Sequence, residues 1–207
     1  MAEFHLEVPL EDEGIVDLSI GDLVYFSGAA WTCRSRLQRY VFDEGHKLPF
    51  STKKKNLLIH VGPIVMEKDG EWKLVSFMPT SSIRFEKWGP ESIREWGLKA
   101  IVGKTTMGKS TALAMKKYHC IHATPLGVTP NLFSNQIQVK DVSWFEELGS
   151  IEAAWHLELR DLGPFLVDMD CEGRNHFDEL DRIIDGKRKE AYEYLSIPED
   201  FEFTKLY

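Results

Sequence analysis

Short apolar runs, bounded by glycine and proline, recur along most of the chain and predict the strands of a sheet. Leu23–Phe26 predicts a buried strand that ends at Gly28. Asn56–Met66 predicts a strand interrupted at Gly62–Pro63, and Asp69–Gly70 predicts a hairpin turn because this pair tolerates positive φ. A strand is predicted from this turn to Pro79, and the remaining predicted strands cover residues 98–104, 120–127, 137–145, 153–162 and 164–170.

Apolar residues at helical spacing predict helices between these strands. Thr32 is the expected N-cap of the first helix, and Gly45 follows its end. Its apolar face consists of Leu37, Tyr40 and Val41. Further helices are predicted at residues 90–97, at residues 110–118 and from about residue 176 onward. Strands outnumber helices and the two kinds interleave, so the sequence predicts a layered α/β domain with a mixed sheet.

The strand and helix pattern divides the chain into a body and a tail. Residues 1–175 carry the alternating elements, and we expect them to form one domain because 207 residues lie within the size of a single domain. Residues 176–207 are charged and amphipathic. They predict a helical tail that packs on the body or meets a partner.

Charge and apolar content exclude several classes of protein. The formal net charge of −8 opposes a general role on nucleic acid or on a lipid surface, because both need an excess of basic residues. The apolar runs fall well short of the roughly 20 residues that a membrane span requires. The N-terminal segment is acidic where a signal peptide is basic, so we expect a cytoplasmic protein.

The cysteines and two neighbouring histidines offer little metal chemistry. Cys33, Cys120 and Cys171 lie far apart, a spacing that matches neither a disulfide framework nor a C-x-x-C metal site. We expect reduced thiols, two of them buried. His119 and His122 could be taken as metal ligands, but on a strand they would point to opposite faces, which favours core and surface positions instead.

A phosphate-binding pattern lies in the middle of the chain. Gly103–Ser110 matches G-x-x-x-x-G-K-[ST] between a predicted strand and a predicted helix. In a nucleotide-binding protein, Lys109 would reach the outer phosphates and Ser110 would contact Mg²⁺, with Asp168 or Asp170 as a further metal ligand. The alternative interpretation is an ordinary glycine-containing turn from strand to helix.

A second set of candidate residues consists of cations that follow predicted strands. Arg34, Arg84 and Lys104 each lie just past a strand, at the end where α/β domains form their ligand crevice. Arginine grips a carboxylate through two parallel hydrogen bonds and lysine acts as a point charge, so three converging cations would suit a dicarboxylate. Residues 80–82 add hydroxyl groups nearby. The alternative is that each cation is a solvated surface group.

Several blocks of sequence, in this order, resemble the β subunit of the iron–sulfur hydro-lyases, the family of L(+)-tartrate dehydratase and class I fumarase. They are GDLVYFSGAAWTCR, LLIHVGPIVMEKDGEWKLVSFMPTSSIR, LKAIVGKTTMG and VSWFEELGSIEAAWHLELRDLGPFLVDMDCEGRN. The resemblance covers about Ile15 to Asn175, and VGPIV, DGEWKLVS and VGKTTMG are most similar to the tartrate dehydratase branch. It implies a swivelling three-layer β/β/α domain.

The resemblance assigns roles to individual residues. It implies that Arg34 and Arg84 bind substrate carboxylates and that Thr80 is the catalytic base. It makes Lys104, rather than Lys109, the functional lysine. The phosphate-binding pattern would then be a coincidence.

The resemblance also implies a reaction, a cofactor and a partner. The reaction is the reversible addition of water to a C=C bond, or its elimination from a 2-hydroxy dicarboxylic acid. The family uses the open iron of a [4Fe–4S] cluster as a Lewis acid, which needs about three neighbouring thiolates. The chain has no such set, so the cluster would lie on a separate α subunit and this chain would form half of an active site. Self-association of the chain in isolation stays open.

Four positions depart from the family pattern. Met78 replaces a glycine, Ser35 an aspartate, Gln38 a histidine and Thr105 a glycine. Each change reshapes the expected pocket. Two alternatives to a tartrate or fumarate enzyme follow: a different dicarboxylate, or a non-catalytic relative with a binding or assembly role.

Overall fold

The computed structural model describes residues 1–198, 200–202 and 204. The chain forms two compact units, Met1–Asn175 and a second unit that starts at His176. The second unit contains α6 (His176–Tyr194), which spans the charged segment for which the sequence predicts a helix. No helix among the described residues is both long and apolar enough to cross a membrane.

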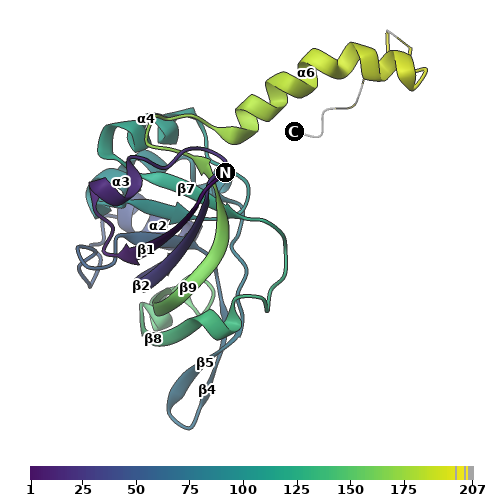
Figure 1. The fold of residues 1–207 in the computed structure, drawn as a ribbon. Coiled ribbons are helices and arrows are strands. Elements are labelled where there is room, and N and C mark those ends of the chain that lie inside the picture. The colour runs from purple at the N-terminus through teal and green to yellow at the C-terminus, as the bar shows by residue number, and fades with distance from the viewer. Residues whose placement is uncertain (199, 203, 205–207) are drawn as a thin grey trace. The chain divides into compact units, whose positions relative to one another are not determined.

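A seven-stranded mixed sheet forms the centre of the first unit, with strand order β1-β2-β3-β6-β7-β9-β8 (Figure 1). A β4–β5 hairpin forms a separate two-stranded sheet. The strands are β1 (Glu3–Val8), β2 (Leu23–Cys33), β3 (Leu57–His60), β4 (Ile64–Lys68), β5 (Glu71–Ser76), β6 (Ala100–Val102), β7 (Ile121–Pro125), β8 (Ile137–Ser143) and β9 (Ala154–Met169).

The helical elements of the first unit are short. They are α1 (Asp12–Ile15), α2 (Ser35–Gln38), the π-helical turn η1 (Arg39–Asp43), the 3₁₀ turn η2 (Ser82–Phe85), α3 (Gly89–Trp96), α4 (Lys109–Tyr118), the 3₁₀ turn η3 (Ser134–Gln136) and α5 (Phe145–Leu148). As predicted, α3 has Pro90 in its first turn and ends at Gly97, which adopts φ +60°. The predicted turn at Asp69–Gly70 joins β4 to β5, and both residues have positive φ.

Alternate residues of the central strands supply two separate hydrophobic cores, one on each face of the sheet. Leu57 and Ile59 of β3 belong to the first core, whereas Leu58 between them belongs to the second. The first core lies between the central parallel strands and the returning β9, and includes Phe26 and Phe165. The second lies beneath the helices and includes residues of α3 and α4. The sequence-based prediction of one layered α/β domain with a mixed sheet is therefore confirmed.

Strand β9 closes the parallel strands into a ring, because it pairs antiparallel with both β7 and β2. The sequence predicts two strands here, separated at Gly163, and this prediction is wrong. β9 bends without ending, and its register with β2 shifts twice, between Val24 and Phe26 and between Phe26 and Gly28. Gly163 lets the two backbones approach, since a Cβ there would lie 2.7 Å from the carbonyl oxygen of Val24.

Two further features of local structure differ from the sequence-based prediction. The sequence does not predict β1, because its glutamates hide the alternation of Phe4 and Leu6 on one face of an edge strand. Thr32 is not an N-cap: β2 continues through Cys33, and the Thr32 hydroxyl accepts a hydrogen bond from the Trp155 backbone N–H at 3.0 Å. The first helix begins only at Ser35.

Candidate active site

The carboxyl ends of three neighbouring parallel strands form the edge where the predicted cations lie. β2 pairs with β3 in parallel and β3 pairs with β6 in the same direction, with Cys33 opposite His60 and Ile59 opposite Val102. Arg34 follows β2 directly, and Lys104 follows β6 after one glycine. Two cations that are distant in the sequence thus share one edge of the sheet.

The segment that carries Thr80 and Arg84 attaches to the same edge through its backbone. The Thr80 N–H donates to the carbonyl oxygen of His60 at 2.7 Å, and the Lys104 N–H donates to the carbonyl oxygen of Thr80 at 2.8 Å. The Ser82 N–H donates to the carbonyl oxygen of Lys104 at 2.9 Å, which completes an isolated parallel bridge. These bonds bring Thr80, Arg84 and Lys104 together.

Arg34 lies at the same edge of the sheet, against the loop that follows β3. A Cβ at Gly62 would lie 2.9 Å from Nη1 of Arg34, so the guanidinium packs directly on the glycine backbone. The Arg34 side chain is only 23% exposed, and its Nε lies 3.4 Å from Oε1 of Glu152. Oε2 of Glu152 in turn accepts a hydrogen bond from the Arg36 N–H at 2.8 Å. Nε of Arg34 has no hydrogen-bond partner among the described residues, so Glu152 balances the charge of Arg34 without a hydrogen bond to it.

The other two cations have no carboxylate partner among the described residues. Nη2 of Arg84 donates to the Thr80 hydroxyl, and the guanidinium carbon lies 5.7 Å from the centroid of the Phe85 ring. In the part of the chain that the structure describes, neither Arg84 nor Lys104 forms an ion pair. A net −8 chain thus keeps local positive charge at this edge, where it can attract a small anion.

A chain of hydrogen bonds between buried polar side chains lies directly beneath the Thr80–Arg84 segment. Oγ of Ser82 lies 2.8 Å from Nδ1 of His60 and 2.8 Å from Nε2 of His122. Nδ1 of His122 lies 2.6 Å from Oδ1 of Asp168. All four side chains are fully buried. Burial, then the nearby His122 and the positive charge of Arg84, hold the pKa of His60 well below its ordinary value.

Sequence reasoning misses this chain of side chains. His122 is a buried core residue and His119 a surface residue, as expected, although the two do not share a strand. His119 follows the last residue of α4 with φ +50°, and its Nδ1 lies 2.8 Å from Oδ2 of Asp12. The sequence suggests Asp168 only as a metal ligand of a nucleotide site. No local pattern signals that these side chains meet, because they come from three different strands and a 3₁₀ turn.

A side chain of the protein, Glu86, occupies the place where the phosphate-binding pattern would bind a phosphate. The Glu86 carboxylate accepts hydrogen bonds from the Gly108 N–H at 2.7 Å, from the Thr111 N–H at 3.1 Å and from the Ser110 hydroxyl. Burial raises the pKa of Glu86, but the hydrogen bonds from Ser110, Thr111 and Gly108 outweigh it, so the pKa lies below its ordinary value. An internal carboxylate thus occupies the start of α4, where a phosphate would bind.

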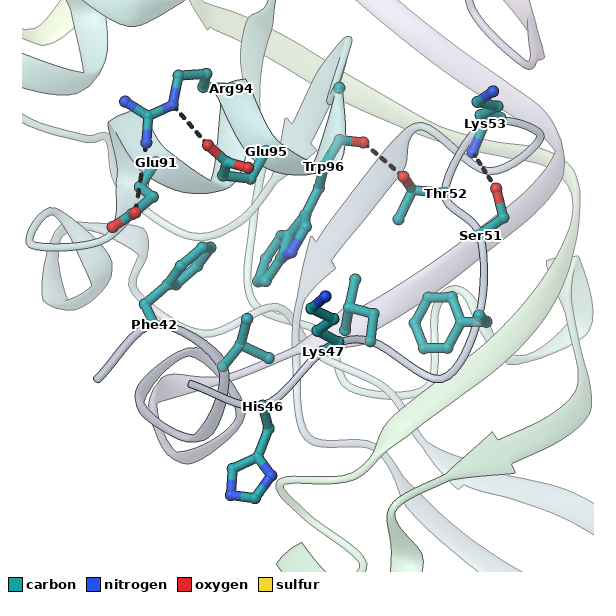
Figure 2. A pocket seen from close by; sticks show the side chains of 14 residues that line it. Phe42, His46, Lys47, Ser51, Thr52, Lys53, Glu91, Arg94, Glu95 and Trp96 are labelled. Atoms are coloured by element: carbon teal, nitrogen blue, oxygen red, sulfur yellow. Dashed lines mark hydrogen bonds and ion pairs between the residues drawn. The ribbon is translucent and has the colours of Figure 1, made fainter. Parts of the chain in front are cut away.

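A well-formed surface hollow lies elsewhere. It has a volume of about 670 Å³ and is lined by aromatic and charged side chains, among them Phe42, Lys47, Arg94 and Trp96 (Figure 2). Figure 2 shows Arg94 turned towards Glu91 and Glu95 of its own helix, so its charge is already paired. None of the predicted site residues lines this hollow.

Comparison with known proteins decides the family. Residues 1–180 match the family described as Fumarase C-terminus. The chain belongs to this family. It is 30% identical over 191 residues to the L(+)-tartrate dehydratase subunit beta of Escherichia coli strain K12, an alignment that covers 92% of this chain and 94% of that protein.

Other relatives of this fumarase C-terminus chain carry related names. A putative L(+)-tartrate dehydratase subunit beta of Methanocaldococcus jannaschii is 30% identical over 185 residues, covering 87% of this chain and 94% of the relative. A putative class I fumarate hydratase of Geobacillus stearothermophilus is 28% identical over 178 residues, covering 86% of this chain but only 34% of the relative. Both names are those of hydro-lyases, enzymes that add or remove water.

The departures from the family pattern have defined structural effects. Nε2 of Gln38 donates to the Ser92 hydroxyl at 3.3 Å, so Gln38 contacts α3 and gives no side-chain support to Arg34. Thr105 has φ +63°, a left-handed conformation that strains a β-branched residue and that glycine adopts without cost. The backbone at Thr105 thus has a conformation that favours the glycine which the resemblance implies at this position.

The thiols of this chain do not fit an iron–sulfur cluster. All three cysteines are buried, one more than the sequence predicts. Burial raises the pKa of Cys33 and Cys120 far above the ordinary value and that of Cys171 to about 12, so the thiols stay protonated at neutral pH. Among the described residues, no group of three or more His, Cys, Asp or Glu side chains is arranged to hold a metal ion.

Proposed function

We propose that the chain is the β subunit of a hydro-lyase that adds water to, or eliminates it from, a small dicarboxylic acid. The observation that supports this proposal is that Arg34, Arg84 and Lys104 all follow segments attached to one edge of the sheet, and that two of them have no carboxylate partner in the described chain. The hydro-lyase names of the relatives support the same reaction class.

Substrate binding follows from the chemistry of the three cations. Each guanidinium can bind one carboxylate through two parallel hydrogen bonds, so Arg34 and Arg84 would hold the two ends of a dicarboxylate. Lys104 would add a point charge between them.

Thr80 is the proposed base for the proton on carbon. Elimination transfers that proton to the Thr80 oxygen, its electron pair forms the C=C bond, and hydroxide leaves the neighbouring carbon. A threonine hydroxyl is a weak base, but the hydrogen bond from Arg84 favours its alkoxide form. Thr80, Arg84 and Lys104 are joined through backbone bonds, which keeps the base close to the bound substrate.

We place the cofactor on a partner. Because the thiols of this chain do not fit a [4Fe–4S] cluster, the cluster would be held by an α subunit and would supply Lewis-acid chemistry there. The term subunit beta in the names of the relatives agrees with such a partner. The free thiols suit a reducing compartment, so we expect the complex in the cytoplasm.

One specific observation favours a second candidate function. Thr105 adds an exposed side chain in a strained conformation directly after Lys104, and we expect it to narrow the space available to a substrate. A non-catalytic relative with a binding or assembly role would tolerate that change.

Anaerobic reconstitution tests the proposed function. The chain is combined with its cluster-bearing α subunit, and hydration or dehydration of tartrate, fumarate and related dicarboxylates is measured. Turnover that Thr80→Val abolishes while the complex stays assembled supports the proposal. A complete, cluster-loaded complex that turns over none of these acids would favour the non-catalytic role.

A further inference from the structure

We propose that His60, His122 and Asp168 are positioning residues that act through Ser82. Their hydrogen bonds fix the Thr80–Arg84 segment, so that its hydroxyl and guanidinium groups face the substrate together. This inference rests on the proposed function and adds to it residues that never touch the substrate.

The hydrogen-bond chain has one direction in which every buried donor is used. An ionised Asp168 can only accept, so Nδ1 of His122 carries a proton and donates to it at 2.6 Å. We infer that Nε2 of His122 then accepts from the Ser82 hydroxyl, which itself accepts from Nδ1 of a neutral His60. Nε2 of His60 remains as an acceptor without a partner among the described residues, which costs less than a buried donor without one.

Ser82 links these buried hydrogen bonds to the site, because it lies between Thr80 and Arg84 and is the first residue of η2. Its backbone N–H bonds to the Lys104 carbonyl, and its hydroxyl bonds to both histidines. The segment is therefore held both by the strand edge above and by the buried chain below.

Gly103 provides the space that this arrangement needs. A Cβ at this position would overlap the Ser82 hydroxyl and lie 3.3 Å from Nε2 of His122. The glycine before Lys104 has no positive φ to explain it, so the room for the hydroxyl is the physical reason for a glycine here.

A purely structural role would not require polar groups at these positions. The neighbouring side chains on the helix-covered face of the sheet, such as Leu58 and Ile101, are apolar and form the second core. Buried polar groups without a hydrogen-bond partner are costly, and here both Nε2 of His60 and Oδ2 of Asp168 have none among the described residues, so an apolar core would be at least as stable. The hydrogen bonds with His60 and His122 instead fix the direction of the Ser82 hydroxyl.

The experiment compares two buried serines in the complete α–β complex. Ser82→Ala removes the link, whereas Ser92→Ala removes a buried hydrogen bond of the same kind between α2 and α3, away from the site. We expect both variants to lose thermal stability, but only Ser82→Ala to lower kcat, by roughly 10- to 100-fold, with a smaller change in KM because Arg34 and Lys104 still bind. Equal kcat values in the two folded variants would overturn the proposal.

Asp168→Asn provides a second, isosteric variant in case Ser82→Ala does not fold. We expect it to release the Nδ1 proton of His122, so that ¹⁵N NMR of the histidine rings detects an Nε2–H tautomer while kcat falls by about tenfold or more. Loss of the Nδ1–H tautomer with unchanged kcat would contradict a positioning role.

An activity-independent measurement separates this inference from the proposed function. Hydrogen exchange of the backbone amides of Thr80, Ser82 and Lys104 is compared in the wild-type chain, Ser82→Ala and Ser92→Ala. Faster exchange at these amides in Ser82→Ala alone supports positioning even if the wild-type complex turns over no dicarboxylate. Unchanged exchange overturns the inference whatever the activity.

Discussion

Two places in this chain are built to attract an anion, and they differ in how their charge is satisfied. At the start of α4 the backbone N–H groups already bind the Glu86 carboxylate. At the carboxyl ends of β2, β3 and β6, only Arg34 has a carboxylate partner, Glu152, among the described residues. A side chain of the protein itself occupies the first place, whereas the second has unpaired positive charge that can bind an external anion.

Charge balance therefore identifies a binding site in this chain better than a sequence pattern does. Gly103–Ser110 fits the phosphate-binding pattern completely, yet its helix start is occupied. Arg34, Arg84 and Lys104 fit no short motif of their own. They stand out because a protein with net charge −8 leaves two of them unpaired in the described structure.

Among the substitutions that compare these two places, Arg84→Met in the reconstituted complex is expected to have the largest effect. Loss of a charged contact to a carboxylate costs about 2–5 kcal/mol, so kcat/KM should fall by at least about 30-fold. Arg94→Met is the matched control, because Arg94 is exposed and already paired with Glu91 and Glu95. Steady-state kinetics on a dicarboxylate checks this prediction, and equal values for the two variants would refute the role of Arg84.

A pair of lysine variants separates the two places directly. Lys104→Ala should lower kcat/KM by about tenfold, since a hydrogen bond to a charged group contributes about 1.5–3 kcal/mol. Lys109→Ala should leave it unchanged, and neither variant should alter binding of ATP, which we expect to be undetectable by titration calorimetry. ATP binding that Lys109→Ala abolishes would restore the nucleotide interpretation.

Stability rather than activity should respond to Glu86. Glu86→Ala leaves the Gly108 and Thr111 N–H groups without their acceptor, and we expect the free energy of unfolding to fall by about 1–2 kcal/mol. Inorganic phosphate should stabilise this variant more than the wild type, because the vacated helix start can accept an anion. Urea unfolding with and without phosphate measures both effects.

The pH dependence of that stabilisation follows from the lowered pKa of Glu86. A carboxyl whose folded pKa is depressed stabilises fully above its unfolded pKa and loses that contribution as the pH falls through the folded pKa. The stability difference between the wild type and Glu86→Gln should therefore be largest at neutral pH and shrink in acid. A difference that grows in acid would show that the carboxylate is not the stabilising form.

The smallest effect is expected at Thr105. Thr105→Gly relieves the positive φ, and after the entropic cost of glycine we expect a gain of about 0.5–1 kcal/mol in the free energy of unfolding. Thr105→Ala keeps a Cβ at the strained position and should gain less. A loss of stability in Thr105→Gly, measured by thermal denaturation, would mean that the threonine side chain is itself stabilising.

Local patterns predict much of the fold. The short strands β6 and β7, the helices α3 and α4 and the Asp69–Gly70 turn have strong local signals in apolar runs, proline and glycine. The continuity of β9 through Gly163 has no such local signal. Pairing with β2 on both sides of Gly163 keeps this strand intact. β1 is likewise defined by its neighbour, since its own sequence is acidic.

The candidate site divides in the same way. Arg34, Arg84 and Lys104 can be proposed from the sequence because each follows a strand, and strands in a parallel sheet end at one edge. Glu152 cannot, because its contact with Arg34 spans most of the chain. His60, Ser82 and His122 meet only after the sheet has formed, so no spacing in the sequence signals their contact.

The proposed function depends most on Arg34 and Arg84 together holding one doubly charged acid. A crystal structure of the complete α–β complex with a bound dicarboxylate shows directly whether they do. We predict that one carboxylate lies on each guanidinium, with Lys104 in contact with the same molecule. A dicarboxylate bound away from these side chains, or contacting only one of the two arginines, would refute the proposal.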